Sequence, residues 1–318
     1  MRNIIKLALV GLLSVSTIVV AAESSPEALR IGYQKGSIGM VLAKSHQLLE
    51  KRYPQSKISW VEFPAGPQML EALNVGSIDL GSTGDIPPIF AQAAGADLLY
   101  VGVEPPKPKA EVILVAENSP IKTVADLKGH KVAFQKGSSS HNLLLRALRQ
   151  AGLKFTDIQP TYLTPADARA AFQQGNVDAW AIWDPYYSAA LLQGGVRVLK
   201  DGTISIKPDR FIWQLAPMQK KTALLFRVYW QPLVSRCVNP QPARAKHRFT
   251  GKNDGLTGTG DCLLLRSSPS YHHQTGYAEV AALQQQTADL FYENRLVPKK
   301  VDIRQRIWQP TQLEGKQL

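Results

Sequence analysis

Apolar and polar positions along the chain follow two periods in turn, which predicts short strands that lead into helices. Residues 29–33 and 131–134 are half-apolar runs that break at glycine, as strands commonly do before a turn. Amphipathic stretches follow at residues 40–51 and 142–150, with the spacing of apolar side chains typical of helices. The pattern therefore indicates a strand followed by a helix at two places in the chain.

A second helix and a second strand follow at each place. The helices are predicted at residues 67–74 and 165–174, and the strands at residues 78–80 and 177–182. Gly76 and Gly175 close the two helices, and Thr164 opens the second as an N-cap with Asp167 three positions later. The order strand, helix, helix, strand, helix is thus predicted in each half.

The two halves are also similar in sequence. Residues 33–37 recur as residues 134–138, an offset of 101, and residues 72–79 recur as residues 171–178, an offset of 99. Two matches at nearly one offset indicate an internal repeat. The repeat predicts an α/β protein of two lobes, each with a mainly parallel sheet flanked by helices.

Ligands of such sheets bind outside the carboxyl ends of the strands, where strands turn into helices. The repeat selects four loops of this kind, at residues 34–37, 82–85, 135–141 and 183–186. Two lobes with two such loops each would form a cleft that closes on one small molecule.

The residue types in these loops favour an oxyanion. Residues 137–140 read Gly-Ser-Ser-Ser between a predicted strand and helix, so helix-start N–H groups, hydroxyls and the positive end of the helix dipole would face the cleft. Residues 82–84, before a helix predicted at residues 86–94, repeat this chemistry. One such turn is more often an ordinary N-cap, but two of them, one between a strand and a helix in each half of the repeat, favour a ligand.

The charged side chains near these loops have explanations other than direct contact with an anion. Lys35 and Lys136 are isolated lysines on loops, which are usually solvated, and neutral donors can hold a tetrahedral anion without them. Asp85 and Asp184 also occupy repeat-related positions. They would repel an anion, so we expect them to cap helices or hold loops, while leaving room for a positive group on a zwitterionic ligand.

Trp183 and Tyr186 are expected either to form an apolar wall for an alkyl or aryl tail or to belong to the core. The histidines give little support to other chemistries. His46 and His130 have no partner at a metal-ligand spacing, and His141 beside the serines lacks a Gly-x-Ser-x-Gly motif and a paired acid. We therefore expect no catalytic residues, no metal and no cofactor.

The first 22 residues have the three parts of an export signal. Arg2 and Lys6 are followed by an apolar run and then by small residues at 20–22, and the run is shorter than the roughly 20 residues of a membrane span. Cleavage is predicted after Ala22, which predicts a periplasmic location.

The basic charge of the chain is concentrated in one segment. Of the formal net charge of +12, residues 203–277 carry +8, from 11 Lys/Arg against three Asp, and they contain no Glu. The remainder carries +4, of which the predicted signal supplies +2. No basic stripe is left elsewhere, so the sequence does not favour nucleic-acid binding.

Several motifs together resemble the aliphatic sulfonate-binding proteins of ABC transporters. They lie at residues 31–36, 81–87, 126–129, 137–141 and 183–186. The resemblance covers residues 28 to about 202 and 278–318 and implies a two-lobed, hinge-closing periplasmic solute-binding protein of type II. It implies lobe 1 at residues 23–110 plus 205–318 and lobe 2 at residues 111–204, with residues 111–115 as the outgoing connection.

This resemblance implies that the chain captures aliphatic sulfonates in the periplasm, for sulfur acquisition, and delivers them to an inner-membrane ABC permease; we expect it to be a monomer. The sulfonate would lie among Gln34, Ser82, Thr83, Gly84, Ser138, Ser139 and His141, with Trp183 and Asp184 near the mouth of the cleft. The loop chemistry adds Lys35, Asp85, Gly137, Ser140 and Tyr186 as candidates. Taurine or nitrate binding, a nonfunctional frame-shifted product and an enzyme on the same scaffold are the alternatives.

Residues 203–277 depart from the family pattern and hold both cysteines and three of the six histidines. Codons for residues 206–213 can be read one frame away as Asn-Gln-Thr-Gly-Ser-Phe-Tyr-Leu, which resembles the family's crossover strand. We therefore interpret the segment as translated out of frame; the alternative is a natural insertion. A chain made as written is expected to lack this strand and several helices of the first lobe.

Overall fold

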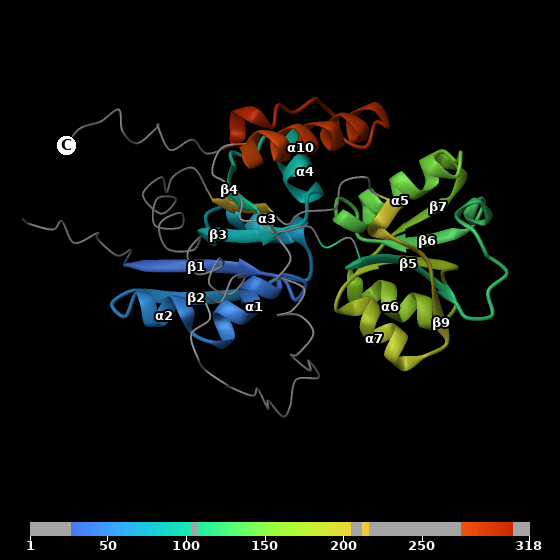
Figure 1. The fold of residues 1–318 in the computed structure, drawn as a ribbon, viewed down its shortest axis with the longest axis horizontal. Coiled ribbons are helices and arrows are strands. Elements are labelled where there is room, and N and C mark those ends of the chain that lie inside the picture. The colour runs from blue at the N-terminus through green and yellow to red at the C-terminus, as the bar shows by residue number, and fades with distance from the viewer. Residues whose placement is uncertain (1–26, 104–106, 108, 205–211, 216–274, 308–318) are drawn as a thin grey trace, which may run out of the picture.

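The computed structural model describes residues 27–103, 107, 109–204, 212–215 and 275–307. The predicted signal, and residues 205–211 and 216–274 of the anomalous segment, lie outside the described residues. Within the described part, every helix is too short or too polar to cross a membrane. Figure 1 shows two sheets, each accompanied by helices.

The first sheet has the strand order β2-β1-β3-β10-β4. Its strands are β1 (Ala28–Tyr33), β2 (Lys57–Glu62), β3 (Leu80–Thr83), β4 (Leu99–Val103) and β10 (Ile212–Leu215). β1 pairs in parallel with β2 and β3, whereas β10 runs antiparallel between β3 and β4.

The helices that accompany this sheet are α1 (Ile38–Ser45), α2 (Leu48–Arg52), α3 (Gly66–Asn74), α4 (Ile86–Ala93) and α10 (Thr275–Glu293). We call this sheet and these helices the first lobe. The single helix predicted at residues 40–51 is wrong, because Gln47 has a φ of 53° and separates α1 from α2. The break brings Met40 of α1 and Leu49 of α2 into the same buried cluster.

The second sheet has the order β7-β6-β8-β5-β9. Its strands are β5 (Glu111–Ala116), β6 (Lys131–Phe134), β7 (Gln159–Tyr162), β8 (Ala179–Trp183) and β9 (Val196–Asp201), and its helices are α5 (Ser139–Gln150), α6 (Pro165–Gln173) and α7 (Tyr186–Gln193). We call these elements the second lobe. β6 pairs in parallel with β7 and β8, and β5 is antiparallel to both its neighbours. Short 3-10 helices lie at Val124–Leu127, Phe155–Asp157, Gly202–Ile204 and Arg304–Arg306.

Each copy of the repeat contains one more strand than the sequence predicted. Each copy contains three strands in the order β2-β1-β3 or β7-β6-β8, and the predicted order omitted β2 and β7. Both omitted strands are at a sheet edge, with many exposed or half-exposed side chains, and β7 contains Pro160, which edge strands tolerate. Their apolar pattern is therefore too weak to indicate a strand.

Other boundaries differ by a few residues. β3 begins at Leu80 and β8 at Ala179, later than predicted, whereas the closing glycines are confirmed, because Gly76 and Gly175 both have a φ of 72°. The predicted N-cap of α6 is also confirmed. Thr164 Oγ1 accepts from the N–H of Asp167 at 3.3 Å and donates to its carboxylate at 2.7 Å.

One carboxylate in each copy holds the first strand to the third. Asp79 accepts from the N–H of Arg30 at 2.8 Å, and Asp178 accepts from the N–H of Lys131 at 2.8 Å. The N–H groups of the two aspartates donate back to the carbonyls of the same residues. The matching bonds keep the loops at the carboxyl ends of these strands in equivalent positions.

Two expectations about the connections are wrong. Residues 111–115 are expected from the sequence to connect the lobes, but they belong to β5, inside the second sheet. The chain crosses between the lobes after β4 and again between β9 and β10. The crossover strand expected to be missing is present as β10, which pairs along four residues with β3 and along four with β4.

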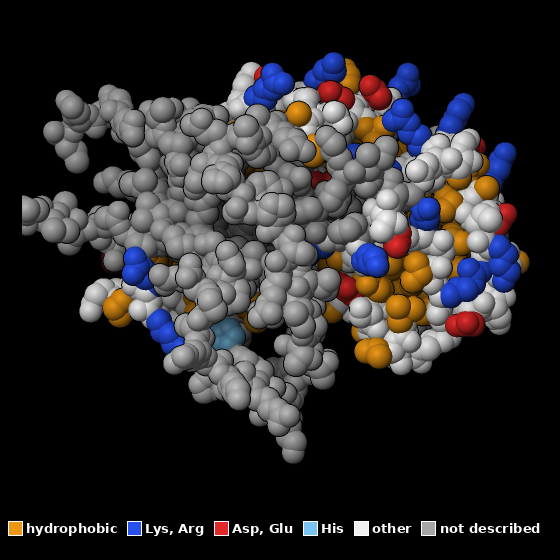
Figure 2. Space-filling view, in the orientation of Figure 1, with side chains coloured by type: hydrophobic (Ala, Val, Ile, Leu, Met, Phe, Trp, Pro, Cys, Tyr) orange, Lys and Arg blue, Asp and Glu red, His pale blue; other side chains and the backbone are white. Residues whose placement is uncertain are grey.

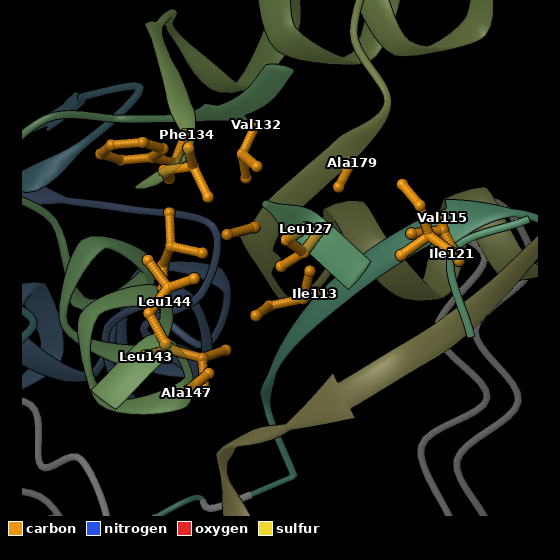
Figure 3. Packing of buried hydrophobic residues seen from close by; sticks show 13 residues of the cluster. Ile113, Val115, Ile121, Leu127, Val132, Phe134, Leu143, Leu144, Ala147 and Ala179 are labelled. Atoms are coloured by element: carbon orange, nitrogen blue, oxygen red, sulfur yellow. The ribbon is translucent and has the colours of Figure 1, made fainter. Parts of the chain in front are cut away.

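Each lobe has its own apolar core. In the second lobe, Ile113 and Val115 of β5 and Val132 of β6 belong to one buried cluster with Leu144 of α5 (Figure 3). A further cluster joins Ile86 and Ile89 of α4 to Phe291 of α10 and also includes Leu145 of α5. That cluster therefore connects the two lobes beside α4, across which α10 lies in Figure 1.

Charged side chains are spread over the outer face of the second lobe. On the face shown in Figure 2, Lys and Arg side chains stand apart, with acidic and hydrophobic side chains between them. This face of the second lobe carries no continuous basic stripe.

Candidate functional site

The loops that the repeat selects meet where the two lobes touch. A Cβ atom on Gly84 would lie 3.0 Å from Cβ of Ser139, and one on Gly36 would lie 2.8 Å from the carbonyl oxygen of Asp184. Neither glycine has a positive φ, so close approach of the other lobe, and not backbone conformation, accounts for the missing side chain. The structure brings the candidate residues of both lobes to one interface.

Buried hydroxyls form the first-lobe side of the site. Gln34 donates from Nε2 to the carbonyl oxygen of Ser82 at 3.0 Å, and the hydroxyls of Ser82 and Ser37 lie 2.9 Å apart. Thr83 is also buried and donates from its hydroxyl to the carbonyl of Gly84 at 2.9 Å. These side chains are neutral, and the end of β3 and the loop after β1 position them.

Ser37 was not among the predicted site residues. It corresponds to Ser138 in the repeat, and each donates its N–H to the carbonyl of the preceding loop glutamine, Gln34 or Gln135, at 3.0 and 3.3 Å. Applying the offset of 101 residues to Ser138 would have identified it from the sequence.

The second-lobe side is the amino end of α5, which begins three residues earlier than predicted. Ser139, Ser140 and His141 therefore lie in its first turn, after Gly137 at a φ of 71° and Ser138 as the N-cap. The Ser138 side chain makes no cap hydrogen bond; it donates to the carbonyl of Gln135 at 2.7 Å and lies 2.9 Å from the Ser140 hydroxyl.

The first N–H groups of a helix have no acceptor within it. The expected alternative, a Ser138 side chain that caps its own helix, is not found at α5. The arrangement can thus offer backbone donors and hydroxyls to an oxyanion.

His141 is fully buried among aromatic rings. Its ring centroid lies 4.8 Å from that of Phe134 and 5.1 Å from that of Phe291, and its Nδ1 accepts from the N–H of Gly137 at 3.3 Å. Burial and the charge of Lys136 lower the pKa of His141 from 6.5 to about 3. The imidazole is therefore neutral, with Nδ1 as acceptor and Nε2 as the protonated nitrogen.

The two repeat-related aspartates have different partners. Asp184 accepts at Oδ1 from the N–H and hydroxyl of Ser188, at 3.3 and 2.5 Å, in the first turn of α7. Asp85 accepts from Nδ2 of Asn142, on α5 of the other lobe, at 2.8 Å. Both carboxylates hold protein elements, as the sequence led us to expect.

The remaining candidates lie nearer the surface. Lys35 is about half exposed, 3.6 Å from the carboxylate of Glu62. The Trp183 and Tyr186 rings meet edge to face at 6.2 Å, with Trp183 buried and Tyr186 partly buried. Burial raises the pKa of Tyr186. The loop that carries Lys35 lies against the other lobe, because a Cβ atom on Gly36 would be 3.2 Å from Cδ1 of Trp183.

The chemistry available at this interface is recognition by neutral donors. In the part of the chain that the structure describes, no three His, Cys, Asp or Glu side chains are grouped as metal ligands would be. Oxyanion binding is therefore the chemistry best matched to the hydroxyls and the helix start.

Comparison with known proteins agrees with this chemistry. A family profile described as NMT1/THI5 like matches residues 60–200. An aliphatic sulfonates-binding protein of Escherichia coli (strain K12) is 78% identical over 319 residues, which cover 100% of both chains. The chain belongs to the family of aliphatic sulfonates-binding proteins.

Solved structures of this family have the same fold. The periplasmic aliphatic sulphonate binding protein SsuA from Escherichia coli has a TM-score of 0.68 and 71% identity, covering 92% of this chain and 96% of that one. The alkanesulfonate-binding protein SsuA from Xanthomonas axonopodis pv. citri, bound to MOPS, has a TM-score of 0.72 and 46% identity, covering 90% and 99%. These relatives are binding proteins, and the fold is that of periplasmic solute-binding proteins.

Proposed function

We propose that the chain binds aliphatic sulfonates and delivers them to the permease of an ABC importer. The observation that carries this proposal is the meeting of two groups of neutral donors, from loops at the strand ends of opposite lobes. A sulfonate carries one negative charge over three oxygens, so hydroxyls and N–H groups on two sides can satisfy it without a counter-ion.

The apolar part of the ligand would lie toward Trp183 and Tyr186. These side chains are near the same interface, and Gly36 leaves space for Trp183. The relative solved with MOPS supports this arrangement, because MOPS is a sulfonate with an alkyl chain and a ring. An aromatic wall accommodates such tails without specifying one tail.

Taurine is a weaker candidate because of its ammonium group. The two acids within the candidate loops, Asp85 and Asp184, already accept hydrogen bonds from Asn142 and Ser188. An ammonium group would therefore compete with existing bonds for its acidic partner. Nitrate lacks a tail and would leave the aromatic side chains unused.

Export and domain closure belong to the same proposal. An export signal at residues 1–22, cleaved after Ala22, would place the monomeric chain in the periplasm beside the permease. The lobes, at residues 23–110 plus 205–318 and 111–204, would close on the anion about the two crossings of the chain.

Residues 203–277 are proposed to be translated out of frame. The concentration of basic residues and the absence of Glu there support this. Resequencing of the coding DNA tests it, and a single uninterrupted frame would refute it.

Calorimetric titration of the full chain with ethanesulfonate, taurine, nitrate and sulfate tests the binding proposal. We expect ethanesulfonate to bind most tightly. Strong binding of taurine or nitrate, with no heat from ethanesulfonate, would overturn the assignment.

A further inference from the structure

We infer that Asn142 and Arg146 are positioning residues that clasp the two lobes together and thereby set the residence time of the ligand. This inference rests on the proposed sulfonate binding. The clasp consists of Asp85 at the start of α4, Asn142 and Arg146 on α5, and Thr287 on α10. α5 belongs to the second lobe, whereas α4 and α10 belong to the first.

Three hydrogen bonds join these residues in a row. Asn142 donates from Nδ2 to Asp85 Oδ2 at 2.8 Å and accepts at Oδ1 from Arg146 Nε at 2.9 Å. Arg146 then donates from Nη2 to the hydroxyl oxygen of Thr287 at 3.0 Å. The amide of Asn142 thus links the carboxylate to the guanidinium through both of its ends.

The first-lobe partners are held in place by their own bonds. Thr287 donates its hydroxyl proton to the carbonyl of Leu283 at 3.1 Å, which leaves its oxygen to accept from Arg146. Gln284 of α10 donates from Nε2 to the carbonyl of Asp85. The clasp therefore fixes α10 and the amino end of α4 against one face of α5.

Apolar contacts on the same face of α5 exclude water from the clasp. Leu145 is 3% exposed and packs with Ile86 and Phe291 of the first lobe. His141, one turn earlier, contacts Phe291 edge to face. Asn142 and Asp85 are 1% and 6% exposed, so their hydrogen bond forms away from solvent, where an unpaired polar group is costly.

α5 couples the clasp to the ligand. Its amino end, at Ser138 to Ser140, is the proposed second-lobe side of the anion site, and the clasp begins two residues later on the same helix. When the lobes close on an anion, α5 brings its first-turn donors and its lateral face into position together. When they part, the bonds to Asp85 and Thr287 break, so the clasp opposes dissociation.

The test measures association and dissociation rates of ethanesulfonate by stopped flow for Arg146→Gln and for the control Arg149→Gln. Arg149 is exposed on the same helix. We expect Arg146→Gln to raise the dissociation rate about tenfold, the lower end for a hydrogen bond to a charged group, with an association rate within about threefold of the parent. Arg149→Gln should change neither rate.

A pair of variants in the other lobe guards against misfolding of Arg146→Gln. Thr287→Val keeps the shape and removes the hydroxyl, whereas Thr287→Ser keeps the hydroxyl. We expect faster dissociation for Thr287→Val and a rate near that of the parent for Thr287→Ser. Unchanged dissociation in both Arg146→Gln and Thr287→Val would overturn the clasp, while absence of binding in the parent and in Arg149→Gln would instead overturn the proposed function.

Discussion

The two copies of the repeat build the same scaffold but use it differently. With the offset of 101 residues, Met40, Val41 and Ser45 of α1 correspond to His141, Asn142 and Arg146 of α5. In the first copy these positions hold a buried methionine, a half-buried valine and an exposed serine. In the second copy they hold the buried histidine and the two residues that reach the other lobe.

The equivalent aspartates differ in the same sense. Asp184 holds the first turn of its own helix, whereas Asp85 bonds to the opposite lobe. Equivalent loops at the strand ends therefore provide hydrogen-bond donors from both lobes. The residues that differ along one face of α5 provide the contacts that hold the two lobes together. Substitution of a few polar side chains in one copy of a duplicated α/β unit can thus create the contacts that hold two lobes closed.

The largest expected effect comes from adding a side chain at Gly84, where the two lobes approach each other closely. Gly84→Val would place a branched side chain against Ser139, because a Cβ atom on residue 84 already lies 3.0 Å from the Cβ of Ser139. Since this contact lies between lobes, each lobe should fold while closure fails, and ethanesulfonate affinity should fall about 100-fold or more. Calorimetric titration measures this loss.

Gly76→Ala is the matched control for that substitution. Its site has nothing within 4 Å but a φ of 72°, so alanine should cost about 1 kcal/mol of stability and leave affinity unchanged. Equal affinity of Gly84→Val and the parent would show that the lobes do not need this close approach.

The second prediction compares Asp79 with Asp178. Asp79 is 3% exposed and also bonds Arg30 Nη2 at 2.6 Å, whereas Asp178 is 42% exposed. Asp79→Asn should lower the free energy of unfolding by about 2 kcal/mol, and Asp178→Asn by less than about 1 kcal/mol. Urea denaturation of the two variants checks the order, and equal losses would mean that burial does not distinguish the copies.

The sequence predicted the repeated loops because glycines and serines mark turns locally. It placed the start of α5 too late because the apolar pattern begins only at Leu143, after serines that are weak helix formers. It could not predict the clasp, since Asn142 and Arg146 are polar residues that periodicity assigns to a solvent-facing side. They are covered because α10, more than 130 residues later in the chain, packs there.

The third prediction concerns His141, whose counterpart in the first copy is Met40. The folded protein keeps His141 neutral down to about pH 3, whereas the unfolded chain binds a proton near pH 6.5. Between these values the unfolded state binds more protons, so the contribution of His141 to stability is greatest above pH 6.5 and falls by up to about 1.4 kcal/mol per pH unit as the pH drops.

His141→Met makes the two copies alike at this position and should remove that part of the slope. Urea denaturation of parent and variant between pH 7 and pH 4 isolates the contribution of His141 from that of the carboxylates, which both proteins share. Parallel stability curves for the two proteins would rule out a buried neutral histidine at this position.

The smallest expected effects come from removing a single serine hydroxyl in one copy of the repeat or the other. Ser138 lies at the amino end of α5, whereas Ser37 contacts the hydroxyl of Ser82 at 2.9 Å. We expect Ser138→Ala to weaken ethanesulfonate binding about tenfold and Ser37→Ala about threefold, because Ser37 acts through Ser82. Ser45→Ala, which removes an exposed hydroxyl, should leave the affinity unchanged. A larger loss for Ser37→Ala than for Ser138→Ala would place the main anion contacts in the first lobe and reverse the comparison between the copies.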